Sequence, residues 1–431
     1  MIAKKLQFKN SRPLKYFIFR LTCVVIAVML TSCEQNPTAP NEPPKPPGYQ
    51  EDIYWPSLAD SPWPMNHHDP QSTGRSKYFG PKFGQIDWKL DSVYMESAAS
   101  IATDGKIYFV SEDKTGLFAV NQDGTIDWIL IDGITLGDVK TTPLIASGSN
   151  LYISGGFSGR FYSINTNGII NWEIDTGVSI DQVGLNIGKD GKIYFVGFDN
   201  LFNSKLFCIN PSGFIEWVYE NNDILSSAAP GTSFSPDGKT LFIPGKGRSI
   251  LALDIETQSV KWSFGKSKLR CTPTIDSNGY IYFVSYLDTI NSGNFSIFCL
   301  KPDGSIRWDY DLGFPGSISD SFYYLEGTLD REGNYYFATN ELFSLDYFGN
   351  LRWKLLLSET EVSGSSLVCD IDGNIYLNVG AFSKYYSISK EGKVNWIVNL
   401  ENQFSGFSPA ISSNKKLIIP TFKSKYFFSI K

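Results

Sequence analysis

NQDGTIDW, residues 121–128, is typical of a tight turn that runs into a short strand. Relatives of this stretch return along the chain, each ending in tryptophan: NTNGIINW, NPSGFIEW, KPDGSIRW, DYFGNLRW and SKEGKVNW. A tight reversal needs backbone positions with positive φ, which glycine and, less readily, Asn and Asp adopt. The return of the same turn with the same tryptophan predicts a repeated structural unit.

The tryptophans set the length of that unit. Eight of the ten follow one lattice, with spacings of 40, 44, 45, 45, 46, 45 and 43 residues, and these are Trp88, Trp128, Trp172, Trp217, Trp262, Trp308, Trp353 and Trp396. Between successive tryptophans three other strand-like segments recur, as in TTPLI, KIYFV and LFAVN. Four strands in a period of about 40–46 residues are typical of a β-propeller blade.

We therefore predict an all-β fold, an eight-bladed β-propeller of four-stranded antiparallel blades over residues 84–431. The repeated tryptophans are expected to fill the interfaces between blades, since an indole buries a large flat surface. The first tryptophan strand, 84–90, has no third strand before it, and the last third strand, 426–431, has no tryptophan strand after it. These two should pair and close the last blade, which leaves no open sheet edge and favours a monomer.

The amino end predicts export and a lipid anchor. Residues 1–32 hold six basic residues and no acidic one, and their apolar run, 21–30, suits a signal peptide and is short for a membrane span. The run ends in LTSC, which resembles the bacterial lipobox and implies that Cys33 carries the lipid; an ordinary cleavage site is the alternative. A lipid attaches a protein to the membrane without spanning it. We expect a lipoprotein of the bacterial cell envelope, at the outer membrane, and leave periplasmic or surface exposure open.

Two segments separate this anchor from the propeller. Residues 33–62 are rich in proline, with six between positions 37 and 47, and predict a semi-rigid linker. Residues 63–83 form a leader that we expect to pack on the propeller. Without the signal peptide the chain keeps 32 basic against 44 acidic residues, a net charge of −12. So acidic a chain binds polyanions poorly, which argues against nucleic acid as a partner.

Metal ligands have only weak candidates. His67 and His68, the two histidines of the chain, stand beside Asp69. Adjacent side chains of an extended segment point in opposite directions, so we expect leader packing here and neither a metal site nor a cofactor. The stretch DIDG, 370–373, has the start of a calcium loop without its remaining ligands.

The cysteines indicate burial. Four of them lie far apart, the chain has no CxxC motif, and we expect small buried side chains while leaving a disulfide open; they are Cys208, Cys271, Cys299 and Cys369. No catalytic Ser/His/Asp or Cys/His arrangement is evident, and we name no catalytic residue.

AVNQDGTIDW (119–128) and ALDIETQSVKW (252–262) resemble the repeat of pyrroloquinoline-quinone-like (PQQ-like, quinoprotein-type) propellers, Ala-x-Asp-x-x-x-Gly-x-x-x-Trp or near it. The likeness covers residues 63–431. In architecture and anchoring the chain is also similar to the lipoprotein propeller of the outer-membrane protein assembly machinery. The resemblance implies the fold, because such propellers include dehydrogenases, scaffolds and binding proteins. A quinoprotein dehydrogenase would bring PQQ, calcium, an Asp base and often two adjacent cysteines, and no two cysteines are adjacent here.

We expect a non-enzymatic protein-interaction scaffold; a quinone-dependent dehydrogenase and a carbohydrate-binding or surface adhesion module are the alternatives. In an up-and-down blade the first-to-second and third-to-fourth turns share one rim. The opposite rim carries longer loops: GGFSGR (155–160), FDNLFNSK (198–205), YLDTINSGNFS (286–296) and DLGFPGSISDSFYY (311–324). Variable loops on a rigid scaffold commonly bind partners, so we expect a protein or glycan there and at the channel mouth.

Overall fold

The computed structural model describes residues 44–91, 93–95, 97–111, 116–137, 141–180, 184–225, 231–246, 250–265, 269, 271–286, 294–315, 326–357, 366–379, 384–400, 407–421 and 426–431. The expected signal peptide and Cys33 lie outside these residues, as do positions 287–293 and 316–324 of two predicted binding loops. The stretch Pro47–Lys431 forms one compact unit. Among the described residues there is no helix with the length and apolar character needed to cross a bilayer.

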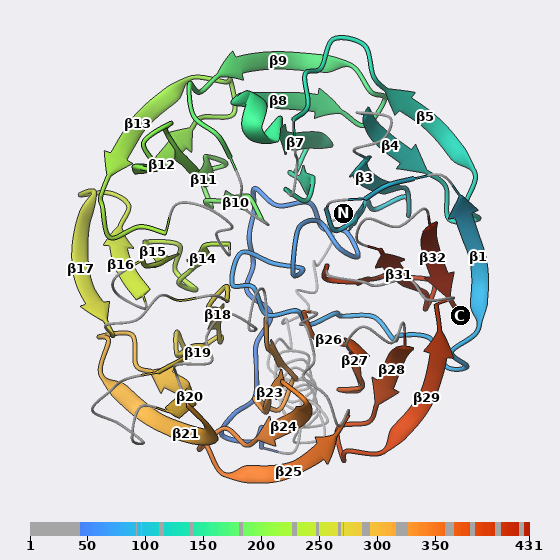
Figure 1. The fold of residues 1–431 in the computed structure, drawn as a ribbon, viewed down its shortest axis with the longest axis vertical. Coiled ribbons are helices and arrows are strands. Elements are labelled where there is room, and N and C mark those ends of the chain that lie inside the picture. The colour runs from blue at the N-terminus through green and yellow to red at the C-terminus, as the bar shows by residue number, and fades with distance from the viewer. Residues whose placement is uncertain are drawn as a thin grey trace, which may run out of the picture. The chain divides into compact units, whose positions relative to one another are not determined.

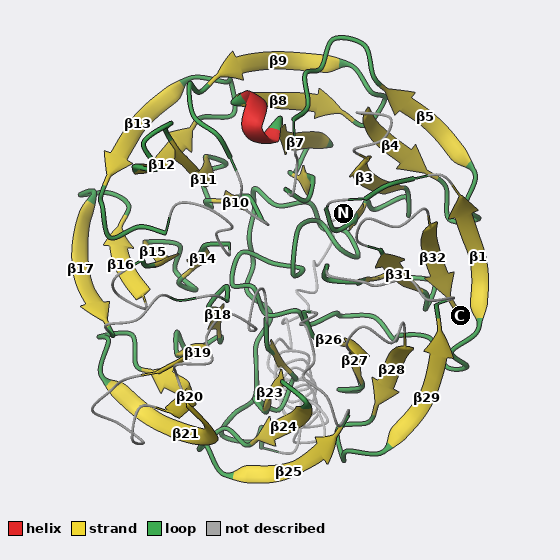
Figure 2. Cartoon of the chain, viewed as in Figure 1, coloured by secondary structure: helices red, strands yellow, loops and turns green. Residues whose placement is uncertain are grey.

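The fold of this unit is a ring of eight four-stranded antiparallel sheets, which confirms the predicted eight-bladed propeller (Figure 1). Figure 2 shows strands joined by loops, and the described residues include a short 3-10 helix, η1 (Gly156–Ser158). Strands are given from the innermost outward. Blade 1 contains β2 (Ser100–Ile101), β3 (Ile107–Ser111), β4 (Gly116–Val120) and β5 (Ile126–Leu130), and blade 2 contains β6 (Leu144–Ile145), β7 (Asn150–Ser154), β8 (Arg160–Asn165) and β9 (Ile170–Asp175). Blade 3 contains β10 (Asn186–Ile187), β11 (Ile193–Phe198), β12 (Ser204–Ile209) and β13 (Ile215–Glu220), and blade 4 contains β14 (Ser233–Phe234), β15 (Thr240–Pro244), β16 (Ile250–Asp254) and β17 (Ser259–Phe264).

Blade 5 contains β18 (Thr274–Ile275), β19 (Ile281–Tyr286), β20 (Asn294–Leu300) and β21 (Ile306–Pro315), and blade 6 contains β22 (Thr328–Leu329), β23 (Tyr335–Ala338), β24 (Glu341–Leu345) and β25 (Leu351–Leu356). Blade 7 contains β26 (Val368–Cys369), β27 (Ile375–Val379), β28 (Lys384–Ile388) and β29 (Val394–Asn399), and blade 8 contains β30 (Ala410–Ile411), β31 (Leu417–Pro420), β32 (Tyr426–Ile430) and β1 (Ile86–Asp91). Middle strands such as β3 and β4 are buried along their length, whereas outer strands such as β9 alternate between partly buried and exposed residues. The core therefore lies between the blades.

Blade 8 is closed by the two ends of the propeller, as predicted. Strand β1 pairs antiparallel with β32, with Trp88 opposite Ser429 and Asp91 opposite Tyr426. Gln85 and Lys431 extend the pairing through two backbone hydrogen bonds of 2.8 and 3.2 Å. Because a segment near the start supplies the outer strand of the last blade, β32 has a partner on both sides.

The repeated turn and the repeated tryptophan meet across each of seven blade seams. Gly124, with φ +88°, lies under the indole of Trp88, and a Cβ there would come within 2.8 Å of the ring. The indole nitrogen donates a hydrogen bond to Gln122 O at 2.9 Å, in the same turn. The other pairs of this kind are Trp128 on Gly168, Trp172 on Gly213, Trp262 on Gly304, Trp308 on Gly349, Trp353 on Gly392 and Trp396 on Gly84. Glycine is thus required twice, for its positive φ and for the space it leaves.

The seam between blades 3 and 4 differs from these seven. The outer turn of blade 4 has Gln258 at the place of the glycine, with a φ of +54°. Trp217 packs there in the same cluster as Ile255, both partly buried. A left-handed backbone is unfavourable for a residue with a Cβ, so this turn is strained where the others are not.

The amino-terminal segment of the unit runs through the middle of the ring (blue in Figure 1) and bonds to the innermost strands. Six of its carbonyl oxygens accept a backbone hydrogen bond, each from the innermost strand of a different blade. With the N–H donor first, the pairs are Ile101 and Trp63, Ile145 and Pro64, Phe234 and Pro70, Ile275 and Gln71, Leu329 and Thr73, and Cys369 and Gly74. In blade 3 the contact is reversed, because Trp55 Nε1 donates to Ile187 O at 2.9 Å. These innermost strands are the inner edges of their sheets, and the segment satisfies donors that would otherwise be open.

Part of the expected linker therefore has another role. Residues 47–62, which the proline content assigned to a linker, lie within the compact unit together with the leader 63–83. Trp55 is 6% exposed and Trp63 fully buried, so burial of these two large side chains offsets the ordering of the segment.

Candidate functional site

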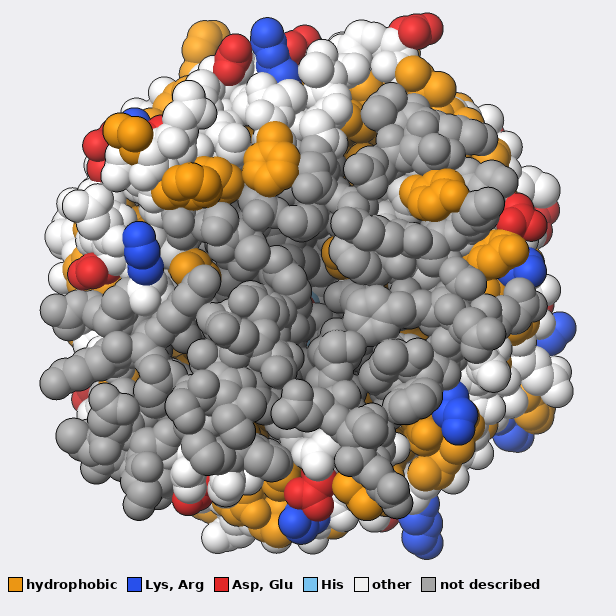
Figure 3. Space-filling model, viewed as in Figure 1, with side chains coloured by type: hydrophobic (Ala, Val, Ile, Leu, Met, Phe, Trp, Pro, Cys, Tyr) orange, Lys and Arg blue, Asp and Glu red, His pale blue; other side chains and the backbone are white. Residues whose placement is uncertain are grey.

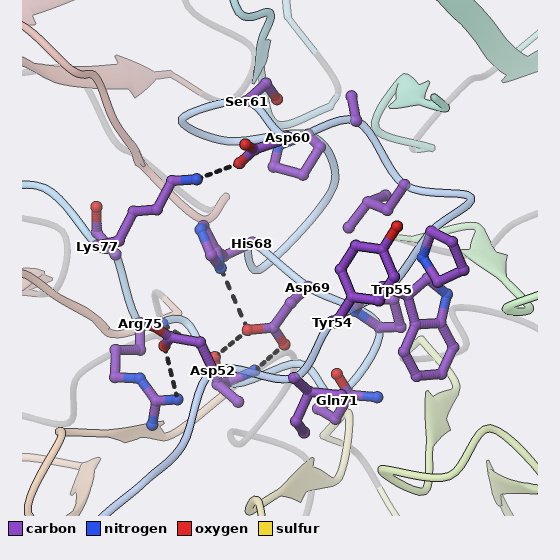
Figure 4. A pocket seen from close by; sticks show the side chains of 18 of the residues that line it. Asp52, Tyr54, Trp55, Asp60, Ser61, His68, Asp69, Gln71, Arg75 and Lys77 are labelled. Carbon is purple, nitrogen blue, oxygen red and sulfur yellow. Dashed lines mark hydrogen bonds and ion pairs between the residues drawn. The ribbon is translucent and has the colours of Figure 1, made fainter. Parts of the chain in front are cut away.

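Two arms of the central segment enclose a basin of about 530 Å3. The first arm runs from Asp52 to Pro64 and the second from His68 to Lys77, and Ser147 and Ser277 of two inner turns complete the wall. Figure 4 shows Tyr54 and Trp55 on one side of this basin, with Lys77 and Arg75 on the other. Pockets of about 300–1,000 Å3 are usual for small ligands, so the basin is large enough for one.

The turn between the arms has an unusual backbone. His67 and His68 have φ values of 54° and 79°, and Ser72 has 55°. Residues other than glycine occupy this region at a cost of about 1–3 kcal/mol each and cluster at functional sites. His67 is fully buried, and its ring nitrogens lie 2.8 Å from Ser72 O and 2.8 Å from Leu367 O. This ring therefore ties the turn to the start of blade 7.

His68 instead forms a pair with its neighbour Asp69. Its Nδ1 lies 3.2 Å from Asp69 Oδ2, and Thr73 donates to the same carboxylate through its backbone N–H at 3.0 Å and its hydroxyl. Burial by itself raises the pKa of Asp69, but the hydrogen bond and charge of His68 and the bonds from Thr73 outweigh it and leave this pKa below its ordinary value. Asp69 is therefore a carboxylate at neutral pH.

The remaining charges of the basin also face opposite charges. Lys77 Nζ contacts Asp60. Arg331 Nη2 donates to both carboxylate oxygens of Asp52 at 3.0 Å, and Asp52 Oδ1 lies 3.9 Å from Arg75 Nη2. Each cationic side chain that lines the basin thus has an acidic neighbour.

The histidines do not converge on one point, because His67 is held by carbonyl groups while His68 is held by Asp69. Within the described ranges no three His, Cys, Asp or Glu side chains are close enough to hold a metal ion. Asp370 accepts bonds from Asp372 N, Asn374 N and the Tyr376 hydroxyl, so its carboxylate stabilises a turn.

The four cysteines within the described ranges are separate buried thiols, all free. Burial raises the pKa of Cys208 to about 11 and that of Cys271, Cys299 and Cys369 to about 12, which makes thiolate formation unfavourable at neutral pH. They act as small apolar side chains of the core.

On the loop rim, two of the predicted binding loops are described throughout. The 155–160 loop folds as η1, and the 198–205 loop is a turn in which Asp199 Oδ1 accepts the N–H groups of Leu201 and Asn203 at 2.9 and 3.0 Å. Leu201 is 80% exposed and Phe202 58%, and Phe202 holds a φ of 59°. Figure 3 shows hydrophobic side chains beside η1 and the β11–β12 connection on this face.

Ring contacts join these loops into one surface. Phe202 stacks on Phe198 at 5.5 Å between ring centres, and Phe198 meets Phe157 of η1 edge to face at 6.3 Å. Phe157 is itself 46% exposed. We call Phe157, Phe198, Leu201 and Phe202 the rim cluster.

Sequence reasoning named the loops of the rim cluster but missed the basin. The prolines of 37–47 led us to place Tyr54 and Trp55 in a linker. The tryptophan and tyrosine pair beside the leader was the available signal, because aromatic residues are uncommon in extended linkers.

Comparison with solved structures confirms the architecture. BamB from Moraxella catarrhalis matches with a TM-score of 0.54 and 17% identity, over 80% of this chain and 97% of that one. A quinohemoprotein alcohol dehydrogenase from Comamonas testosteroni matches with a TM-score of 0.63 and 10% identity, over 88% and 81%. A europium-containing methanol dehydrogenase gives a TM-score of 0.60 and 11% identity, over 83% and 89%.

This chain is an eight-bladed β-propeller that is similar in fold to these three proteins. The resemblance to the outer-membrane assembly propeller and to the quinoprotein dehydrogenases is thereby confirmed at the level of architecture. No protein-family model and no curated sequence matches the chain. Identities this low carry the fold and leave the function to the sites.

Proposed function

We propose that this protein is a lipid-anchored, non-enzymatic interaction scaffold of the bacterial envelope that binds a partner protein through the rim cluster. The observation that carries the proposal is the presentation of Leu201 and Phe202. Both are exposed, and a turn fixed by Asp199 points them out of a rigid propeller. Burying two such side chains against a partner stabilises a complex by about 1.5–3 kcal/mol each.

The backbone of Phe202 supports the same reading. Most tight turns of the propeller put glycine at the left-handed position, as at Gly124 and Gly168, and the exceptions Ser149, Gln258 and Lys415 are not aromatic. The 198–205 turn keeps a phenylalanine there at a cost of about 1–2 kcal/mol. The ring of Phe202 stacks on Phe198 yet stays 58% exposed, so the larger part of its surface is left for a partner. Binding to a partner protein accounts for an exposed phenylalanine on this left-handed backbone.

The proposal is tested with the double variant L201S/F202N. Asparagine tolerates the left-handed backbone, so the turn should keep its shape and the protein its melting temperature, while the apolar surface disappears. Wild type and variant are cross-linked in intact cells, and the proteins bound are compared by mass spectrometry. We expect partners that wild type captures and the variant loses.

The matched control is Phe214→Ser, which removes a 70% exposed phenylalanine from a tight turn on the opposite rim. This control should keep the partners. Equal capture by L201S/F202N and wild type would contradict the assignment of the rim cluster.

Two further parts of the proposal have their own measurements. Cys33→Ser should move the protein from the membrane fraction to the soluble fraction and abolish labelling with radioactive palmitate. Reconstitution with PQQ and Ca2+ should give no dye-linked dehydrogenase activity with alcohols or sugars; activity above that of the protein without PQQ would replace the scaffold by an oxidoreductase.

A further inference from the structure

The basin between the two arms of the central segment has the polar groups of a ligand site. Ser61 is 3% exposed and Arg75 8% exposed, and both line the basin. Ser61 Oγ, Arg75 Nη1 and His68 Nε2 are buried without a hydrogen-bond partner among the described residues. Such atoms are costly to leave unpaired, at about 1–3 kcal/mol each, which indicates a group that satisfies them.

The kinds of atom that lack partners restrict the ligand. Since His68 Nδ1 faces the carboxylate of Asp69, Nδ1 carries a proton, and Nε2 is left to exchange a hydrogen bond with a ligand. Arg75 Nη1 is a donor, and the Ser61 hydroxyl is both. A ligand hydroxyl both donates and accepts, so hydroxyl groups can satisfy all three atoms.

The charged side chains of the basin also favour a ligand that bonds through hydroxyl groups. Lys77 contacts Asp60, and Arg75 is 3.9 Å from Asp52. Because each of these two cations already faces an acidic side chain, neither is left to neutralise an anionic ligand. The basin suits a neutral molecule.

The apolar wall offers a flat surface to such a molecule. Tyr54 is 82% exposed at the lip, and the buried Trp55 is fixed by its bond to Ile187 O. An exposed aromatic ring in the same basin as polar atoms without partners matches the two faces of a sugar, one with C–H groups and one with hydroxyls.

We propose that the basin binds a neutral carbohydrate, with Tyr54 under the apolar face of one sugar ring and Ser61, His68 and Arg75 bonded to its hydroxyls. These three atoms are covered, so the hydroxyls reach them after small side-chain rotations, as about the Cα–Cβ bond of Ser61. The basin lies against the inner turns, on the rim opposite the rim cluster, and its ligand is additional to the protein partner.

The experiment uses the full chain in detergent on an array of neutral, sialylated and sulfated oligosaccharides, followed by calorimetry with the best neutral probe. Maltotriose, mannobiose and N,N′-diacetylchitobiose are included as soluble probes. We expect binding to neutral glycans, weakened at least tenfold by Tyr54→Ala and kept by Tyr54→Phe. Tyr54 is exposed, so both variants should fold. Phe214→Ala is the matched loss of an exposed ring elsewhere and should bind as wild type does.

A second variant separates ligand binding from a structural role. Ser61→Ala removes a buried hydroxyl that has no partner, so the melting temperature of the ligand-free protein should stay equal or rise, while the affinity for the glycan falls. The inference is overturned by an array without neutral binders, by equal binding of acidic glycans, or by an unchanged affinity of Tyr54→Ala. None of these results affects partner capture by the rim cluster.

Discussion

The two rims of the propeller use their turns in opposite ways. On the tight-turn rim, one turn recurs with a glycine under the tryptophan of the neighbouring blade, as Gly304 lies under Trp262. On the loop rim, no two of the described connections are alike, and one of them exposes Leu201 and Phe202. The comparison teaches that the first rim holds the ring together, whereas the second is free to vary and to bind.

The largest effect on stability is expected from removing the strand that closes blade 8, because the tight-turn rim would lose one of its seams. Deleting residues 84–90 takes β1 and Trp88 out of blade 8 and leaves β32 with an open edge. Loss of one core tryptophan costs about 3–5 kcal/mol, and here a partly buried tryptophan is lost together with its whole strand, so unfolding should become far easier and the protein should associate. Gel filtration and calorimetry check this. Unchanged elution and melting would show that the ring does not depend on its closure.

The next effect isolates the contact between glycine and indole. Gly304→Ala puts a Cβ 2.6 Å from Trp262 at a φ of +84°, whereas Gly148→Ala has the same φ of +84° and no atom within 4 Å. We expect a loss of about 2–4 kcal/mol for the first and about 1 kcal/mol for the second, measured by urea unfolding. Equal losses would mean that only the backbone matters.

A gain in stability should come from the exceptional seam. Gln258→Gly relieves the left-handed backbone of the blade 4 turn, with a φ of +54°, and should raise the free energy of unfolding by up to about 1 kcal/mol. Urea unfolding measures it. A less stable variant would show that the Gln258 side chain contributes to this seam in place of glycine.

The smallest effect is a pH dependence of the closing blade. The hydrogen bond from Lys416, at 2.5 Å, lowers the pKa of Asp87 against a smaller opposing effect of burial, and Lys431 at 3.3 Å adds to it. A lowered pKa means stability that is present above the ordinary value of 3.8 and lost as the pH falls through the folded value. Asp87→Asn should therefore lower the melting temperature slightly at pH 7 and lose that difference near pH 2. A constant difference would contradict the ion pair.

The residues predict the fold well because its determinants are local. The turn NQDGTIDW and its relatives contain both the residue that allows a positive φ and the indole that packs across the seam, and the count of such pairs gives the number of blades. The candidate sites are less predictable. The loop lengths pointed to the 198–205 turn, but nothing in FDNLFNSK shows that Phe202 holds a left-handed backbone in contact with Phe198.

By itself the sequence determined the repeat, the eight blades and the pairing of β1 with β32, since each follows from short-range chemistry repeated at a fixed interval. The tertiary structure alone decided the course of the central segment. Its hydrogen bonds join Trp55 to Ile187 and His67 to Leu367, residues 132 and 300 positions apart, and no local pattern encodes partners at such separations. The basin exists because the inner edges of the blades need those bonds and only the assembled ring offers them together.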